Sequence, residues 1–225
     1  MAEATTLLDA KKEPSLADEW SGGTLPYRIG HRKLGMWLFI MSDSLTFAAL
    51  LFTYSYVRFS SEGWPKPFPF SPSIIFSSVM TLVLLSSSLT MVFAVAAAKQ
   101  GRKKSARYWI LATMFFGLAF VVLHGMEWNH LMNEGLYMNS LPEEWLKNSN
   151  WQGSTILFGS TFFGITGLHM FHVITGVLYL GFVALRIRKM TAEDVETSGL
   201  YWHFVDLVWM FVFPLIYLMS INFKS

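Results

Sequence analysis

The chain contains no cysteine and few charged residues. None of its 225 residues is Cys, and only 14% are Asp, Glu, Lys or Arg. The absence of thiols excludes disulfides, thiolate metal sites, iron–sulfur clusters and c-type heme attachment within this chain. The shortage of charge accompanies 53% hydrophobic residues, which fall in long blocks. This combination is typical of an integral membrane protein.

Five of the apolar blocks are long enough to cross a bilayer, because a helix needs about 20 residues to span a hydrocarbon core of about 30 Å. Helices and closed barrels are the structures that satisfy backbone polar groups in lipid, so we expect an all-α, polytopic bundle of five transmembrane helices. Residues 1–33 are expected to form a cytoplasmic tail and residues 34–225 the transmembrane domain. The expected spans are residues 34–57, 74–98, 108–131, 155–185 and 200–223.

The basic residues are distributed unevenly among the loops. Thirteen Lys and Arg residues precede the first span or follow the second or fourth span, and four lie in the remaining loops and at the C-terminal end. By the positive-inside rule this predicts a cytoplasmic N-terminus and a C-terminus on the outer, periplasmic side. The net charge of +2 therefore reflects topology and does not indicate a nucleic-acid partner.

Two loops are expected on the outer side. Residues 59–73 contain four prolines alternating with aromatic residues, which predicts a non-helical segment at the membrane interface. Residues 132–153 form the second outer loop, where a short interfacial helix is expected to follow Pro142.

An acidic residue stands deep within the first apolar span. Asp43 lies nine residues into that span, about 13 Å deep at 1.5 Å per residue. Ser42, Ser44 and Thr46 flank it and can supply hydrogen bonds. Intramembrane acids are costly, so we consider two interpretations: a proton-linked or partner-facing carboxyl, and a neutral acid that joins helices.

Histidines and a second acid occur in the fourth and fifth spans. His169 and His172 are spaced i and i+3 on one face, which raises the hypothesis of a metal site. No Glu-x-x-His pair accompanies them in the fourth span, so hydrogen-bonded packing histidines are the favoured interpretation. His203 and Asp206 have the same spacing, and could pair with each other or with Asp43 and His172 in the inner half of the membrane.

Glu127 closes the third span beside Trp128. Its depth places it near the outer interface, where a carboxylate next to an indole has a low free-energy cost. An anchoring role is therefore favoured. The chain shows no P-loop, catalytic triad or nucleotide fingerprint, and we assign it no catalytic residue and no metal ligand.

Small residues in the second and fourth spans favour close helix packing. The second span contains Thr81 and residues 86–90 (SSSLT), and the fourth contains Ser160, Gly164 and Gly167. Small side chains allow helix backbones to approach closely, and hydroxyls can bond across the contact.

Five segments carry motifs in a fixed order: residues 35–43 (GMWLFIMSD), 86–90 (SSSLT), 120–128 (FVVLHGMEW), 166–173 (TGLHMFHV) and 201–209 (YWHFVDLVW). Taken together, they resemble subunit III of the heme-copper terminal oxidases, the cytochrome c and quinol oxidases, in its short five-helix form. Residues 35–43 resemble the family pattern G-x-W-x-F-x-x-S-E, and residues 120–128 resemble F-x-x-x-Q-x-x-E-W/Y. Three positions depart from the family: Asp43 replaces its Glu, His124 its Gln and Met170 a Gly. The other matching segments are residues 86–90, 166–173 and 201–209.

The resemblance implies a non-catalytic subunit of a proton-pumping oxidase that reduces oxygen to water in aerobic respiration. It implies no cofactor in this chain, with heme and copper in partner subunits. Subunit I is the main expected contact, beside other oxidase subunits and structural phospholipids, and a larger respiratory supercomplex is compatible. The expected role is to support the stability and proton uptake of subunit I in a bacterial inner membrane. The candidate lipid-binding residues are Trp37, Arg186 and Lys189.

Two alternatives remain open from the sequence. One is an accessory subunit of a nitric oxide reductase, from the same superfamily. The other is a heme- or metal-binding membrane protein that uses His124, His169, His172 and His203. The electron donor is also open, because cytochrome c, a quinol and direct delivery from another complex all fit this chain.

Overall fold

The computed structural model describes residues 30–61, 64–66, 68–140 and 155–222. In this part of the chain, five helices are long and apolar enough to cross a membrane, which confirms the predicted all-α bundle. Residues 1–29 of the expected tail and the expected helix after Pro142 lie outside the described residues. The long helices are α2 (His31–Ser60), α3 (Ile75–Lys99), α4 (Lys103–Asn133), α6 (Thr155–Arg186) and α7 (Ala192–Val212).

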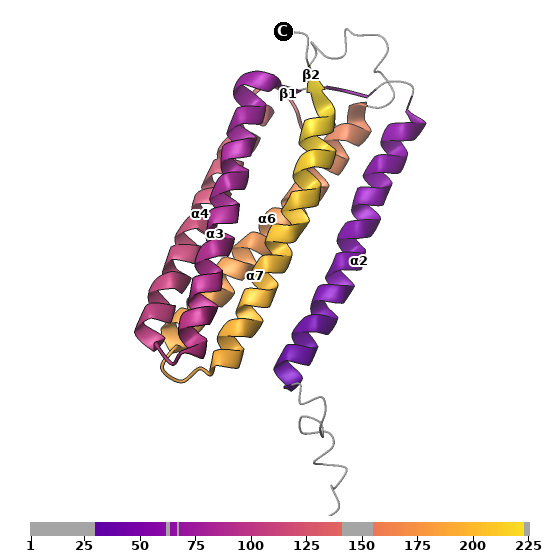
Figure 1. Ribbon diagram of the computed structural model, residues 1–225. Coiled ribbons are helices and arrows are strands. Elements are labelled where there is room, and N and C mark those ends of the chain that lie inside the picture. Colours follow the sequence, from indigo (N-terminus) through magenta and orange to yellow (C-terminus); the bar gives the residue numbers. More distant parts are fainter. Residues whose placement is uncertain (1–29, 62–63, 67, 141–154, 223–225) are drawn as a thin grey trace, which may run out of the picture.

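Helices α3 and α4 form a tight antiparallel hairpin (Figure 1). Gly101 at the turn has a φ of 72°, a left-handed conformation that favours glycine and commonly ends helices. The backbone N–H of Arg102 donates to the carbonyl of Ala97 at 2.9 Å and closes the end of α3. Midway along the hairpin, the hydroxyls of Thr90 and Thr113 lie 2.8 Å apart and link the two helices.

The indole of Trp202 on α7 joins four helices. It is 1% exposed, and its Nε1 donates to Ser87 Oγ on α3 at 2.9 Å. A Cβ atom on Gly117 of α4 would lie 2.5 Å from this indole, and a Cβ on Gly176 of α6 would lie 3.0 Å from it. The two glycines therefore form a slot that a larger residue would block, and the single indole N–H finds its partner inside the bundle.

The small residues of α3 and α6 pack as expected at some positions and not at others. Thr81 Oγ1 accepts a hydrogen bond from Trp209 Nε1 at 3.0 Å. A Cβ on Gly167 would lie 3.1 Å from Trp128. The expectation for Gly164 is wrong within the described chain, because a Cβ there would meet nothing within 4 Å. Spacing alone could not distinguish a glycine that faces another helix from one that faces outward.

Helix α2 stands at the edge of the bundle and is the least buried of the five (Figure 1). Ion pairs attach its N-terminal end to α7: Arg32 with Asp194, and Lys33 with Glu196 at 3.0 Å. Near its other end, Tyr54 is 1% exposed and its hydroxyl lies 3.3 Å from Ser220. Polar contacts near both ends of α2 thus attach it to the bundle, although the helix buries little of its own surface.

Helix α7 begins at Ala192, eight residues before the expected fifth span. Thr191 and Asp194 form a capping box, in which the Thr191 hydroxyl accepts from the Asp194 N–H while the Asp194 carboxylate accepts from the Thr191 N–H at 2.9 Å. The Thr-x-x-Asp pattern that marks this start is visible in the sequence. Hydropathy missed it because the first turns of the helix are polar.

The proline-rich segment is partly inside the bundle, which corrects the expectation of a wholly interfacial loop. β1 (Phe68–Pro69) pairs in parallel with β2 (Ile221–Asn222), after which η1 (Phe70–Ile74), a kinked π-helical segment, leads into α3. The Phe68 ring is 1% exposed and stacks on Tyr217 at 5.0 Å between centroids. The alternation of proline with aromatic residues predicts a place at the membrane interface, but this ring packs in the core.

We predict that Gly117→Val lowers the free energy of unfolding of the subunit by about 1–3 kcal/mol, because the new side chain overlaps the Trp202 indole. Thermal unfolding in mild detergent and recovery of the assembled subunit would measure the effect. Gly125→Val on the same helix is the matched control, since a Cβ at Gly125 meets nothing within 4 Å. Equal recovery and equal melting temperatures of the two variants would contradict the claim that Gly117 makes room for the Trp202 indole.

Candidate functional site

Asp43 of α2 and His172 of α6 form a pair between two helices. The Asp43 Oδ2 and His172 Nε2 atoms are 3.1 Å apart, and both side chains are largely buried. The other ring nitrogen, Nδ1, lies 2.8 Å from the carbonyl oxygen of Leu168. A carbonyl oxygen only accepts hydrogen bonds, so Nδ1 carries a proton. The Nε2 atom therefore faces the carboxylate as a lone pair unless a further proton is present.

One additional proton makes this pair stable. It can reside on Nε2, which gives an imidazolium beside a carboxylate, or on Asp43, which gives a carboxylic acid donating to a neutral imidazole. Without it, a lone pair would face an ionised carboxylate at 3.1 Å. Asp43 Oδ2 has no hydrogen-bond partner among the described residues that could replace that proton. The 3.1 Å separation is therefore suited to one proton shared between Oδ2 and Nε2.

A cavity of about 600 Å³ adjoins the Asp43–His172 pair. Two hydroxyls on its wall, Thr175 Oγ1 and Tyr201 Oη, are 2.9 Å apart, and Tyr201 also donates to the backbone carbonyl of His172. Tyr201 thereby links α7 to the α6 turn that carries the imidazole. The cavity is lined by Met36, Phe39, Asp43, Phe171, His172, Thr175, Tyr179 and Tyr201.

His203 and Asp206 occupy a different part of the bundle. His203 Nδ1 lies 2.7 Å from Ser88 Oγ on α3. Asp206 is 6% exposed, and its Oδ1 has no hydrogen-bond partner among the described residues. In that same part of the chain, neither residue makes an ion pair with Asp43 or His172. The structure therefore brings two of the four inner polar residues together and places the other two along the α3–α7 contact.

Glu127 is buried where the sequence suggested an interfacial anchor. It is 7% exposed, and its carboxylate accepts hydrogen bonds from Ser77 Oγ on α3 and from Tyr217 Oη, each at 2.7 Å. Tyr217 belongs to η3 (Phe213–Tyr217), the π-helical turn that follows α7 and contains Pro214. His124 Nδ1 lies 3.6 Å from the same carboxylate. Depth along α4 gave no information about which side Glu127 faces.

The last of the four candidate histidines, His169, packs inside the bundle. It is fully buried, its Nε2 donates to the carbonyl of Val205 at 3.0 Å, and its ring lies 5.0 Å from that of Trp209. That hydrogen bond leaves Nδ1 as the nitrogen with a lone pair. Among the described residues, no group of three or more His, Asp or Glu side chains is arranged to hold a metal ion.

The candidate lipid contacts lie on the surface. Trp37 on α2 is 47% exposed. Arg186, the last residue of α6, places its guanidinium 4.7 Å from the centroid of the Phe182 ring. Lys189 follows in the exposed turn before α7. Exposed basic side chains beside aromatic rings at a helix end suit a membrane interface.

The sequence identified the intramembrane acids and placed Asp43 and His172 in one possible network, but it did not indicate the partners of Glu127. Nothing in the sequence pattern singles out Ser77 and Tyr217, and His124 stands out only as a departure from the family and as one of four candidate metal ligands. Ser77 and Tyr217 lie 50 and 90 residues from Glu127 along the chain. No local pattern reports such contacts, because each hydroxyl also has ordinary helix-surface or aromatic-packing interpretations.

Comparison with known proteins finds a match to the family model described as cytochrome c oxidase subunit III over residues 21–221. The chain is 33% identical over 193 residues to cytochrome bo(3) ubiquinol oxidase subunit 3 of Pseudomonas putida, covering 84% of this chain and 86% of that protein. It is 31% identical over 195 residues to cytochrome c oxidase subunit 3 of Alkalihalophilus pseudofirmus, covering 84% and 87%.

A third relative, quinol oxidase subunit 3 of Bacillus subtilis, is 29% identical over 195 residues, covering 84% of this chain and 87% of the relative. The match extends over all five long helices, and the expectation drawn from the motifs is confirmed. The chain belongs to the cytochrome c oxidase subunit III family of the heme-copper oxidases.

Proposed function

We propose that this chain is the redox-silent subunit III of a proton-pumping terminal oxidase, in which heme and copper in partner subunits reduce oxygen to water. Subunit I is its main contact, beside other oxidase subunits. The relatives are named as subunits of both cytochrome c and quinol oxidases, so the electron donor is a property of the partner subunits. The observation that carries the proposal is the subunit III family match over all five long helices.

The proposed orientation places the N-terminus in the cytoplasm of a bacterium, with the protein crossing the inner membrane. It is supported by a concentration of basic residues at one end of the bundle. There Lys33 and Lys99 both contact Glu196, at 3.0 and 3.5 Å, and Lys103 Nζ donates to the carbonyl of Arg188 at 2.9 Å. Clustered lysines and arginines favour the cytoplasmic side. Residues 34–225 act in this proposal as one transmembrane domain.

The Asp43–His172 pair is the proposed proton-linked site. Asp43 is the thirteenth residue of α2, so it lies about 18 Å along the helix from its basic end. A carboxyl and an imidazole 3.1 Å apart exchange a proton without requiring a net charge within the bundle. In this position the pair stores a proton beside subunit I during turnover, which supports proton uptake and protects the catalytic subunit from inactivation. His203 and Asp206 have a structural role along α3.

Phospholipids are proposed to contact the surface at the basic end of the bundle. Arg186 and Lys189 are exposed there, and their charges suit a phosphate headgroup. Trp37, on the exposed face of α2, is placed to contact the lipid. This contact would hold α2, the least buried helix, within the complex.

The proposal is tested by tagging the chain, extracting it in mild detergent and recording the visible spectrum and oxygen consumption of what co-purifies. We expect heme-containing subunits and cyanide-sensitive oxygen reduction. The separated chain should be optically silent, because its histidines are not arranged around a metal. Co-purification with a nitric oxide reductase, or a heme spectrum from the separated chain that His172→Ala abolishes, would contradict the proposal.

We predict that Asp43→Asn leaves assembly intact and slows proton uptake, or shortens the lifetime of the enzyme during turnover. Asparagine has nearly the same volume but cannot exchange a proton with His172. Proton uptake and the number of turnovers before inactivation should be measured in the purified complex. Thr46→Val, an isosteric change at an exposed site of α2, is the matched control. If both variants match the wild type, Asp43 has only a structural role.

A further inference from the structure

Glu127 lies near the C-terminal end of α4, and the cavity beside it is lined by Phe68 of β1, so it is at the β1–β2 end of the bundle. It is six residues from the end of α4, a rise of about 9 Å. Among the described residues, no Lys or Arg lies within ion-pair distance of its carboxylate, and the basic side chain that does is His124. The imidazole is therefore the group that can balance a negative charge on Glu127.

The Glu127 carboxylate is contacted by groups from three elements of the described chain. Ser77 faces it from α3 and Tyr217 from η3, while His124 and His130 belong to its own helix. His169 of α6 lies beyond His124, with the Phe120 ring 5.7 Å from one imidazole and 5.8 Å from the other. Two hydroxyls and the His124 imidazole contact the acid, and the exposed His130 lines the cavity beside it.

In the part of the chain that the structure describes, the ionised acid would have hydroxyl donors but no positive charge to balance it unless His124 is protonated. Tyr217 Oη donates to Glu127 Oε2 at 2.7 Å. The single hydroxyl proton of Ser77 has two acceptors within reach, Glu127 Oε1 at 2.7 Å and the carbonyl of Ser73 at 3.0 Å. Both ring nitrogens of His124 are buried without a hydrogen-bond partner among the described residues. A neutral His124 beside an ionised Glu127 would leave an uncompensated charge in an apolar bundle. One additional proton, on either residue, removes that charge.

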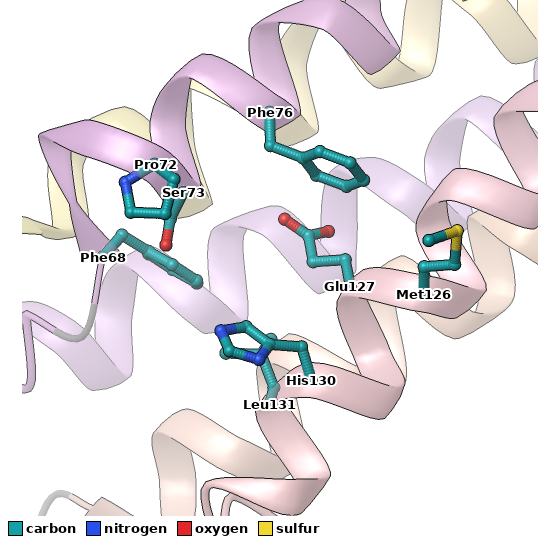
Figure 2. A pocket seen from close by; sticks show the side chains of 8 residues that line it. All are labelled: Phe68, Pro72, Ser73, Phe76, Met126, Glu127, His130 and Leu131. Atoms are coloured by element: carbon teal, nitrogen blue, oxygen red, sulfur yellow. The ribbon is translucent and has the colours of Figure 1, made fainter.

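A cavity of about 240 Å³ connects this acid with the surface. Figure 2 shows the Glu127 carboxyl directed into the space between Phe68 and Phe76. His130 lines the same cavity. The side chain of His130 is 65% exposed, and its Nε2 lies 3.3 Å from Glu134. Titratable residues thus continue along one face of α4, from the buried His124 and Glu127 through the cavity to an exposed pair.

We propose that His124 and Glu127 form a second one-proton binding site, loaded from the β1–β2 end of the bundle through the cavity beside His130. The ligand is a proton delivered by hydronium, which leaves as water. Under the proposed orientation this end faces outward, the side on which a pumping oxidase releases protons; only the assignment of the side rests on that proposal. Because the sequence carries His124 where the resembled family has Gln, the site would distinguish this chain from those relatives.

Infrared spectra of the purified, resting complex test whether the pair holds a proton. We expect a carboxylic C=O band that is lost in Glu127→Gln. A wild type without the band would still support the pair if the band appears in His124→Leu, because removal of the imidazole then leaves the proton on Glu127. Absence of the band from both wild type and His124→Leu would overturn the proposal. No turnover is required, so failure here is independent of the Asp43 experiment.

Exchange into D2O tests the route to the surface. We expect the Glu127 signal to shift rapidly in the wild type and more slowly in Ser73→Leu, which fills the cavity. Ser86→Leu, an exposed change on α3 away from the cavity, is the matched control and should exchange like the wild type. Unchanged exchange in Ser73→Leu would contradict loading through this cavity. The Glu127→Gln spectrum identifies the band in each variant.

Discussion

The rest of the bundle depends on the placement of the Trp202 indole. Its ring fills the slot between Gly117 and Gly176, and its N–H reaches Ser87, so one side chain of α7 fixes the spacing of α3, α4 and α6. The next residue, Tyr201, bonds the carbonyl of His172 and the hydroxyl of Thr175. The contact that holds the helices together is therefore continuous with the one that positions the imidazole opposite Asp43.

The polar interior follows one electrostatic constraint: a buried acid needs either a proton or a positive partner. Asp43 meets the constraint with His172 between α2 and α6, while Glu127 has Ser77, Tyr217 and His124 around it. In each case an imidazole approaches a carboxyl and the pair can remain neutral. Such an arrangement can carry protons beside a catalytic subunit, while electron transfer takes place elsewhere in the complex.

The sequence predicted the number and type of helices well, because long apolar blocks and their length are local properties. It also identified the acids Asp43 and Glu127, since charge in an apolar block stands out. It failed where contacts between distant segments decide the outcome. Gly164 and Gly117 look equivalent in sequence, yet only Gly117 meets an indole. The burial of Phe68 likewise depends on Tyr217, which lies almost 150 residues further along the chain.

We propose that this chain assists proton movement in an oxidase whose electron transfer it does not perform. Time-resolved proton uptake and oxygen consumption by the purified complex, before and after this subunit is removed, test that proposal. The depleted complex is expected to keep its heme spectrum and initial oxygen reduction, take up protons more slowly and inactivate during turnover. Loss of a heme or copper signal with the subunit, or unchanged uptake and lifetime, would contradict it.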